Sequence, residues 1–248
     1  MSSTFNSFST TQPSSNFSKD FLESNSIIAK LAFLFFIVIL FFFSLQIGTT
    51  ILAYFFKGSS TQKLINGSVD AKTAQIFYQD PSSNPHQTIN RSQNASDGIE
   101  FTWSTWIFIN DIKYLENQYR HIFYKGNYNL DQSTGLNFPN NAPGLYIAPH
   151  TNALVVMMNT FNDINKEIII PDVPLNKWLN VIIRCEGKTL DVYINGTITR
   201  SIDLEGVPKQ NYGDVYVAMN GGFDGYISNL WYYNYALGIN ADRKSTRL

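Results

Sequence analysis

Paired carboxylates are the residues of this sequence that could carry out hydrolytic chemistry. A retaining enzyme cleaves a glycosidic bond with two carboxyl groups held about 5 to 5.5 Å apart. On one strand face such a pair appears at positions i and i+2. Asp203 and Glu205 have this spacing, but they stand at the end of a strand pattern that stops at Gly206. The other close pairs are Glu167 with Asp172, separated by Pro171, and Asp111 with Glu116 in a loop-like stretch. We therefore expect no catalytic couple.

Other site chemistries lack their residues in this sequence. One cysteine, Cys185, and three histidines cannot make a Cys/His zinc set, and one cysteine cannot close an intramolecular disulfide. Because Cys185 lies in the strand pattern VIIRCEG and no histidine lies near it in sequence, we expect an inert, strand-borne thiol. No Ser/His/Asp order, phosphate-binding glycine loop or HExxH helix is present. With 18 basic against 19 acidic residues and no basic block, we expect no nucleic-acid partner.

A membrane segment is expected near the N-terminus. Only 15% of the 248 residues are charged, and none of the 26 residues between Lys30 and Lys57 is. A helix of this length exceeds the roughly 30 Å hydrocarbon core. The pattern predicts one transmembrane helix over residues 31–56, with a cleaved signal peptide and a buried core helix as alternatives. The usual signal-anchor arrangement predicts a single-pass membrane protein whose C-terminal domain is extracytoplasmic.

The flanks of the helix have a different composition. Residues 1–30 predict a disordered polar tail, and residues 57–98, interrupted by Gly, Pro, Asn and Ser clusters, predict a stalk or linker in which AKTAQIFYQD could add one strand. Residues 242–248, DRKSTRL, match the translation of a sequencing adapter, so we expect an assembly artefact there. Glycosylation sequons begin at Asn16, Asn66, Asn90, Asn94 and Asn195.

From residue 99 to 241 short β-branched and aromatic runs alternate with turn signals, which predicts an all-β domain. Asn195-Gly196 is the preferred dipeptide of a type I′ hairpin, and a second hairpin is expected at Glu186-Gly187-Lys188. The ten expected strands are Phe101–Ile109, His121–Lys125, Gly144–Ile147, Ala153–Asn159, Lys166–Ile170, Trp178–Glu186, Thr189–Ile194, Ile198–Asp203, Val215–Met219 and Tyr226–Tyr233.

Large aromatic residues are expected to fill the core of this domain. Trp178 opens a strand pattern and is assigned to the core together with Val181 and Ile183; the same role is expected for Trp103, Trp106 and Trp231. Phe223 stands among three glycines, at 221, 222 and 225, and is expected to plug the edge of the domain from a tight loop.

Four stretches together resemble a known family. They are FTWSTWIFI at 101–109, PGLYIAPHTNALVVMMN at 143–159, VPLNKWLNVIIRCEGKTLDVYINGTI at 173–198 and YGDVYVAMNGGFDGYISNLWYYNYAL at 212–237. The chain is similar to the laminin-G-like branch of the concanavalin A-like lectin/glucanase superfamily. This resemblance implies an antiparallel jelly-roll sandwich of two sheets. Membrane-tethered versions with an FTWS-type first strand are similar to proteins of large nucleocytoplasmic DNA viruses.

The resemblance also implies what the domain binds. Laminin-G-like modules commonly recognise glycans or protein partners, some through a loop-held calcium, which needs six to eight oxygen ligands. In this sequence Asp214, Asn220 and Asp224 flank the last loop and are the candidate calcium ligands. The paired-acid signature of the family's glucanases, Glu-x-Asp-x-Glu or Glu-x-Asp-x-x-Glu, is absent.

A second candidate site lies in a long polar loop. Sugar recognition combines aromatic faces with amide hydrogen bonds. The stretch from Asp131 to His150 offers such groups, and the candidate ligand-binding residues are Asn137, Asn140, Asn141, Tyr146 and His150.

These observations predict a noncatalytic, membrane-anchored, lectin-like adhesion module for a glycan or a surface protein. Two alternatives remain open. One is a structural envelope or capsid-associated protein, and the other is a degenerate glycoside hydrolase that uses Asp203 and Glu205.

Overall fold

The computed structural model describes residues 27–56 and 58–238, in two compact units that divide near Gly58. The predicted artefact at 242–248 and most of the predicted tail lie outside the described residues. Residues 27–30, which we assigned to the tail, instead form the first turn of the helix, because Ile27 and Ile28 extend its apolar run.

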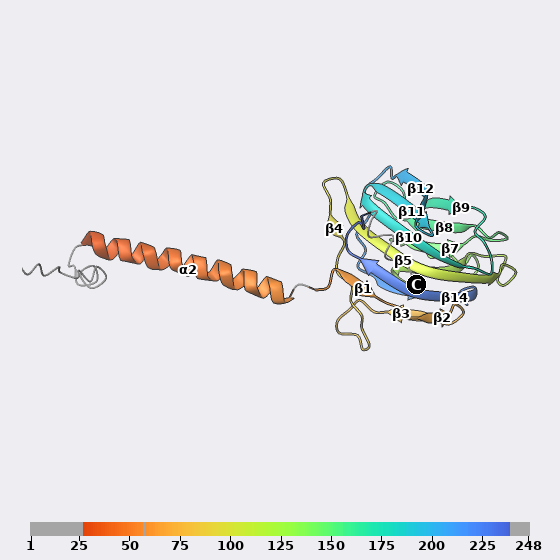
Figure 1. Cartoon of the computed structure of the whole chain (residues 1–248), viewed down its shortest axis with the longest axis horizontal. Coiled ribbons are helices and arrows are strands. Elements are labelled where there is room, and N and C mark those ends of the chain that lie inside the picture. The colour runs from red at the N-terminus through yellow and green to blue at the C-terminus, as the bar shows by residue number, and fades with distance from the viewer. Residues whose placement is uncertain (1–26, 57, 239–248) are drawn as a thin grey trace, which may run out of the picture. The chain divides into compact units, whose positions relative to one another are not determined.

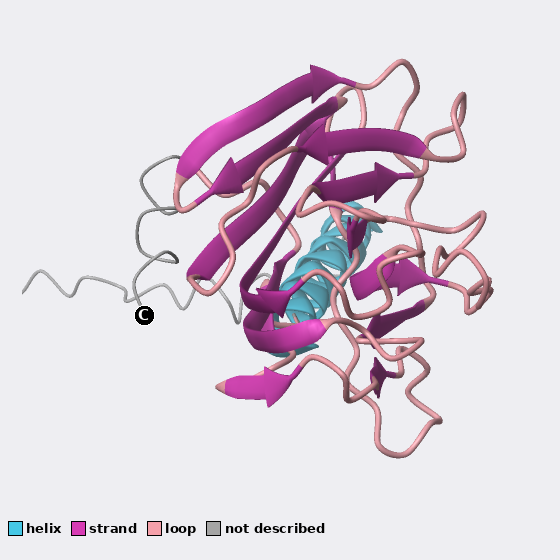
Figure 2. Cartoon of the chain, turned by 90° about the vertical axis from the view of Figure 1, so that its right-hand side faces the viewer, coloured by secondary structure: helices cyan, strands magenta, loops and turns pink. Residues whose placement is uncertain are grey.

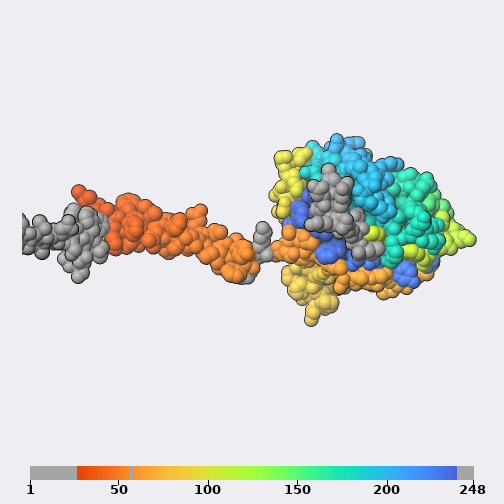
Figure 3. All heavy atoms as spheres, viewed as in Figure 1, coloured from red at the N-terminus to blue at the C-terminus, as the bar shows by residue number. Residues whose placement is uncertain are grey.

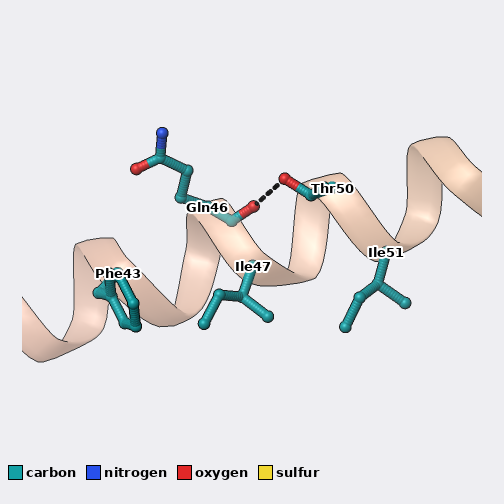
Figure 4. Close-up of a pocket in the computed structure, with 5 residues that line it drawn as sticks. All are labelled: Phe43, Gln46, Ile47, Thr50 and Ile51. Atoms are coloured by element: carbon teal, nitrogen blue, oxygen red, sulfur yellow. Dashed lines mark hydrogen bonds between the residues drawn. The ribbon is translucent and has the colours of Figure 1, made fainter.

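The first unit is helix α2 (Ile27–Phe56), which is long and apolar enough to cross a membrane by length and composition. Its polar side chains bond to the helix itself. The Thr50 hydroxyl donates to the Gln46 carbonyl oxygen at 2.8 Å (Figure 4), and the Ser44 hydroxyl donates to the Phe41 carbonyl oxygen at 2.8 Å. Such bonds lower the cost of placing hydroxyl groups in an apolar environment.

The second unit is a sandwich of two sheets in which every strand pairing is antiparallel (Figures 1 and 2). The larger sheet has the order β1-β14-β5-β10-β11-β12, with β2 also on β14 and β4 on β5, and the smaller has the order β3-β13-β6-β7-β8-β9. The strands are β1 (Thr61–Lys63), β2 (Ser68–Asp70), β3 (Gln75–Phe77), β4 (Gln93–Asn94), β5 (Ile99–Asp111), β6 (Arg120–Gly126), β7 (Gly144–Ile147), β8 (Leu154–Met158), β9 (Lys166–Ile170), β10 (Trp178–Gly187), β11 (Thr189–Ile194), β12 (Thr197–Asp203), β13 (Asp214–Val217) and β14 (Asp224–Tyr233).

All ten predicted strands are present, with ends that shift by at most two residues. The Asn195-Gly196 turn joins β11 to β12 with φ of 51° and 78°, as a type I′ turn requires. Phe223 is fully buried beside Gly221 and Gly222, which both have positive φ, so the predicted plug is confirmed.

Only one tryptophan lies in the core between the sheets. Trp103 is 1% exposed and packs against Phe123 and Tyr232, with ring centroids 5.1 and 4.8 Å away. The core assignment was wrong for Trp106, Trp178 and Trp231. These three belong to the outer face of the larger sheet and are partly exposed, because alternate residues of a strand point to opposite faces.

The predicted stalk over residues 57–98 also needs correction. It supplies β1, β2, β3 and β4, and Leu64, Ile65 and Ala71 are buried in the core. In Figure 3 this segment, orange to yellow, lies beside the blue C-terminal strand, in agreement with the pairing of β1 and β2 with β14. In the sequence, the first strand of the folded unit therefore begins only a few residues after the helix ends.

Cys185 lies on the inner face of β10 and is fully buried. Burial raises the pKa of its thiol to about 12, so the thiolate is scarce at neutral pH. We expect iodoacetamide to leave Cys185 unmodified in the native protein and to alkylate it fully after unfolding in urea, as measured by intact mass. Rapid alkylation of the native protein would contradict this burial.

Candidate functional site

A polar cavity of about 270 Å³ opens at the end of the smaller sheet where β3 and β6 finish and β13 begins. Three segments far apart in the sequence form its wall: residues 79–91, strand β6, and the loop that precedes β13. The lining residues are Gln79, Ile89, Asn90, Arg91, Lys125, Gln210, Asn211 and Tyr212. The volume is slightly below the roughly 300–1,000 Å³ of pockets for drug-sized ligands, which suits a single sugar unit.

Lys125 is the most buried polar group of this cavity. It is 6% exposed, and its ammonium donates one hydrogen bond, 2.7 Å long, to the carbonyl oxygen of Gly213. Gly213 itself packs closely on the end of β6, since a Cβ there would lie 2.3 Å from the carbonyl oxygen of Gly126. Burial lowers the pKa of Lys125 to about 8, and the nearby Asp214 carboxylate opposes this shift.

The other walls are held by hydrogen bonds within the loops. The Gln79 side chain donates to the carbonyl oxygens of Phe77 and Gln87 and accepts from the backbone N–H of Ile89. These bonds fix the loop that carries Asn90 and Arg91, and the Asn90 amide donates to the carbonyl oxygen of Ser59 at 2.6 Å.

Two lining side chains of the cavity have a polar atom or a ring face without a partner in the fold. The side-chain oxygen of Gln210 is buried and accepts no hydrogen bond, which is costly for an amide oxygen removed from water. The Tyr212 ring is 69% exposed at the rim and offers a flat apolar surface. A ligand with hydroxyl donors and an apolar face would satisfy both groups.

A second exposed feature is a row of aromatic rings on the outer face of the larger sheet. The strand register places Tyr226 of β14 and Trp178 of β10 on either side of Phe108 of β5. The ring centroids of Tyr226 and Trp178 lie 6.3 and 5.5 Å from that of Phe108, and these side chains with Ser68 line a hollow of about 210 Å³. Sequence reasoning missed this row because it assigned Trp178 to the core.

The structure brings the predicted polar-loop residues together, but inside the fold. Asn137, Asn141 and Tyr146 are fully buried. The Tyr146 hydroxyl donates to the Asn141 side chain at 2.6 Å, and the Asn137 amide donates to the carbonyl oxygen of Asn140 at 2.6 Å. His150 is separate, on the exposed turn between β7 and β8. Asn137, Asn141 and Tyr146 therefore need correction from ligand-binding to loop-holding, because their polar groups are hydrogen-bonded within the loop, whereas the assignments of Asn140 and His150 stay predictions.

The predicted calcium ligands do not converge. Asp214 accepts from the backbone N–H of Gln79 at the start of β13, whereas Asn220 lies beyond the other end of that strand and donates to Gln118. The Asp224 carboxylate forms an ion pair with Lys72 at 2.6 Å. Among residues 27–56 and 58–238, no three His, Cys, Asp or Glu side chains cluster to hold a metal ion. The three predicted ligands are thus committed to other partners.

The alternative acid pair lies at the end of β12. Asp203 accepts a hydrogen bond from the Thr189 hydroxyl at 2.8 Å, and Glu205 lies 3.6 Å from the Lys166 ammonium. Both acids are exposed, and neither lines the polar cavity. Asp203 and Glu205 therefore lie at a solvent-exposed strand end, as the strand pattern that stops at Gly206 predicts.

The comparisons with known proteins bear on residues 80–239, which match a family model described as concanavalin A-like lectin/glucanases superfamily. None of the curated proteins matches the sequence significantly.

Several solved structures have a similar fold. The receptor binding domain of botulinum neurotoxin D is 15% identical over 74% of this chain and 52% of its own, with a TM-score of 0.47. The serotype G binding domain is 11% identical over 75% of this chain and 46% of its own, with a TM-score of 0.47. The serotype D ligand binding domain in complex with N-acetylneuraminic acid is 16% identical over 74% of this chain and 50% of its own, with a TM-score of 0.46. The chain spans about half the length of these structures.

Proposed function

The chain belongs to the concanavalin A-like lectin/glucanases superfamily, and from this premise we propose that it is a noncatalytic, membrane-anchored module that binds a glycan in the Lys125 cavity. The observation that carries the proposal is the cavity itself. It combines an unpaired buried amide oxygen, a buried ammonium and an exposed tyrosine ring in a space of sugar size. Few polar groups in fixed positions, beside an apolar face, are what sugar recognition requires.

The absence of catalysis is part of the proposal. Hydrolysis of a glycosidic bond needs a carboxylic acid beside the bond that breaks. No acidic residue is among the side chains that line the cavity, and Asp203 and Glu205 are engaged with Thr189 and Lys166 elsewhere. Release of reducing sugar that Glu205→Gln abolishes would instead support the hydrolase alternative.

Helix α2 supports the membrane anchor in this proposal. A tethered domain with a small cavity binds each sugar weakly, with dissociation constants of roughly millimolar to micromolar. Many copies on one surface then bind together far more tightly than one copy alone. The extracytoplasmic or virion-exposed location and the likeness to viral proteins stay predictions, which the neighbouring genes would test.

We expect the full-length chain, displayed in many copies on vesicles, to bind glycans on an array, and Tyr212→Ala to weaken that binding about fivefold or more, since removing a tyrosine ring on which the ligand packs costs about 1 kcal/mol or more. Asn90 heads a sequon and lines the cavity, so the protein is made in a host without N-glycosylation.

The matched control is Tyr226→Ala, which removes another exposed tyrosine, from the aromatic row. It should leave glycan binding unchanged. If Tyr226→Ala abolishes binding and Tyr212→Ala does not, the glycan site is the aromatic row and the cavity is the wrong site. If the unaltered protein binds no glycan on the array, the proposal of glycan binding is contradicted.

A further inference from the structure

We infer that the Lys125 cavity selects an acidic sugar unit, whose carboxylate is bound by the Lys125 ammonium and whose hydroxyl group donates to the Gln210 side chain. This inference rests on the proposed function, because it names the class of glycan that the same cavity takes.

The first argument is the unmet bonding capacity of the ammonium. A lysine ammonium has three N–H donors, and here it makes one hydrogen bond, to the Gly213 carbonyl oxygen. A charged group that is 6% exposed is costly to bury unless an opposite charge or further hydrogen bonds accompany it. A ligand carboxylate supplies both at once, in a charge-assisted bond.

The second argument is the charge of the wall. Arg91, an exposed residue, is the second cation of the cavity, and the lining residues include no Asp, Glu or His. Asp214 is the acidic residue close to Lys125, and its oxygens lie at hydrogen-bond distance from the backbone N–H of Gln79 and the Tyr216 hydroxyl. With the Asp214 carboxylate counted, Lys125 and Arg91 leave one net positive charge at the cavity, which favours an anion.

The third argument separates a sugar acid from a simple anion. A sulfate or acetate ion could pair with Lys125 but has no donor for the buried oxygen of Gln210, whereas a neutral sugar could donate to Gln210 but has no charge for Lys125. A sugar acid carries both groups within one small molecule, beside a ring face that can lie on Tyr212. The unused hydrogen-bonding capacity of the Lys125 ammonium and of the Gln210 side-chain oxygen together therefore favours an acidic sugar.

The test compares two pairs of sugars that differ only at C6: methyl glucuronide with methyl glucoside, and methyl galacturonide with methyl galactoside. By calorimetry on the full-length chain in detergent micelles at pH 7, we expect at least one acid to bind about tenfold or more tightly than its neutral partner, the factor that one charge-assisted hydrogen bond of 1.5 to 3 kcal/mol provides. Acetate or sulfate at the same concentration as the acidic sugar should not displace that sugar from the cavity.

Three substitutions test whether Lys125 and Arg91 cause the tighter binding of the acidic sugar. Lys125→Met keeps the apolar stem and should remove the preference for the acid, and Arg91→Gln, on an exposed side chain that does not threaten the fold, should reduce it severalfold. Lys188→Met, which removes a half-buried lysine between β10 and β11, is the matched control and should change nothing.

A pH series separates recognition from a merely structural role of Lys125. The charged or titratable side chains around the ammonium are Asp214, Arg91 and Tyr212. Because burial lowers the pKa of Lys125 to about 8, the preference should decline between pH 7 and pH 9, and in Lys125→Arg, which stays charged, it should persist.

The outcomes below contradict either the inference alone or the proposed function as well. Equal binding of acid and neutral sugars, both lost in Tyr212→Ala, would overturn the inference and leave the proposed function standing. Displacement by acetate or sulfate would show that the cavity takes any anion, which also overturns the inference. If none of the four sugars binds by calorimetry and no glycan binds on the array, the proposed function would be overturned as well.

Discussion

A soluble fragment that begins at Ile99 is expected to lose the native fold, whereas one that begins at Ser59 and ends at Gly238 is expected to keep it. The shorter fragment lacks β1 and β2 on β14 and β3 on β13, so it exposes the edges of both strands. It also removes Leu64, Ile65 and Ala71 from the core. Emptying the space of one buried Leu or Ile costs about 2–5 kcal/mol, and domains are stable by only about 5–15 kcal/mol in total.

The measurement is thermal unfolding followed by circular dichroism, with limited proteolysis as a second probe. The fragment 59–238 should melt cooperatively and resist protease, and the fragment 99–238 should aggregate or be digested. The double variant Leu64→Ala/Ile65→Ala in the longer fragment is the graded control and should fall between them. A cooperative melt of the shorter fragment within a few degrees of the longer one would show that the N-terminal segment is dispensable.

This segment marks the limit of what the sequence could predict about the fold. The ten strands of residues 99–241 have four or more residues, long enough for alternation and β-branched content to be visible. Strands β1 to β4 have two or three residues and stand between turn signals, so no period can be read in them. Of the four, β3 lies in the stretch AKTAQIFYQD, which was expected to add one strand. The pairing of β1 and β2 with β14, and of β3 with β13, is decided by contacts more than 100 positions away in the chain.

The candidate site shows the same limit more strongly. Its groups come from residues 79–91, 125 and 210–212, which only the folded sandwich brings together. One local signal was present, since Lys125 is a lysine inside the otherwise aromatic and apolar stretch HIFYKG. The sequence reasoning chose the Asn-rich loop instead because its residue types suit sugar binding. Residue type does not tell whether an amide faces a ligand or, as with Asn137 and Asn141, a neighbouring amide or hydroxyl group.

Acidification is expected to destabilise the sandwich domain through His121. The ring is 1% exposed on β6, with the rings of Tyr124 and Tyr146 centred 5.0 and 5.4 Å away. Its Nδ1 accepts a hydrogen bond from the backbone N–H of Met219 at 2.8 Å, so the neutral ring carries its proton on Nε2, which has no partner. A second proton would have to enter at Nδ1 and would break the bond to Met219.

Burial accordingly lowers the pKa of His121 from 6.5 to about 3. Between these two values the unfolded chain binds a proton that the folded domain does not. The stability that neutral His121 contributes is therefore complete above pH 6.5 and declines as the pH falls toward 3. At pH 5 the expected loss is about 2 kcal/mol in the free energy of unfolding.

Urea unfolding of the full-length chain in detergent at pH 7 and pH 5 measures this loss. His121→Asn is the matched variant, because its side-chain oxygen can accept from Met219 in the place of Nδ1 but does not titrate. We expect this variant to be less stable than the unaltered protein at pH 7, because it packs less well, and to lose about 2 kcal/mol less on going to pH 5. The same loss in both proteins would assign the acid sensitivity to carboxylates.

The prediction also bears on binding, since β6 carries both His121 and Lys125. If protonation of His121 loosens β6, acid should weaken sugar binding at a pH where Lys125 is fully charged, and the His121→Asn variant should not show that loss.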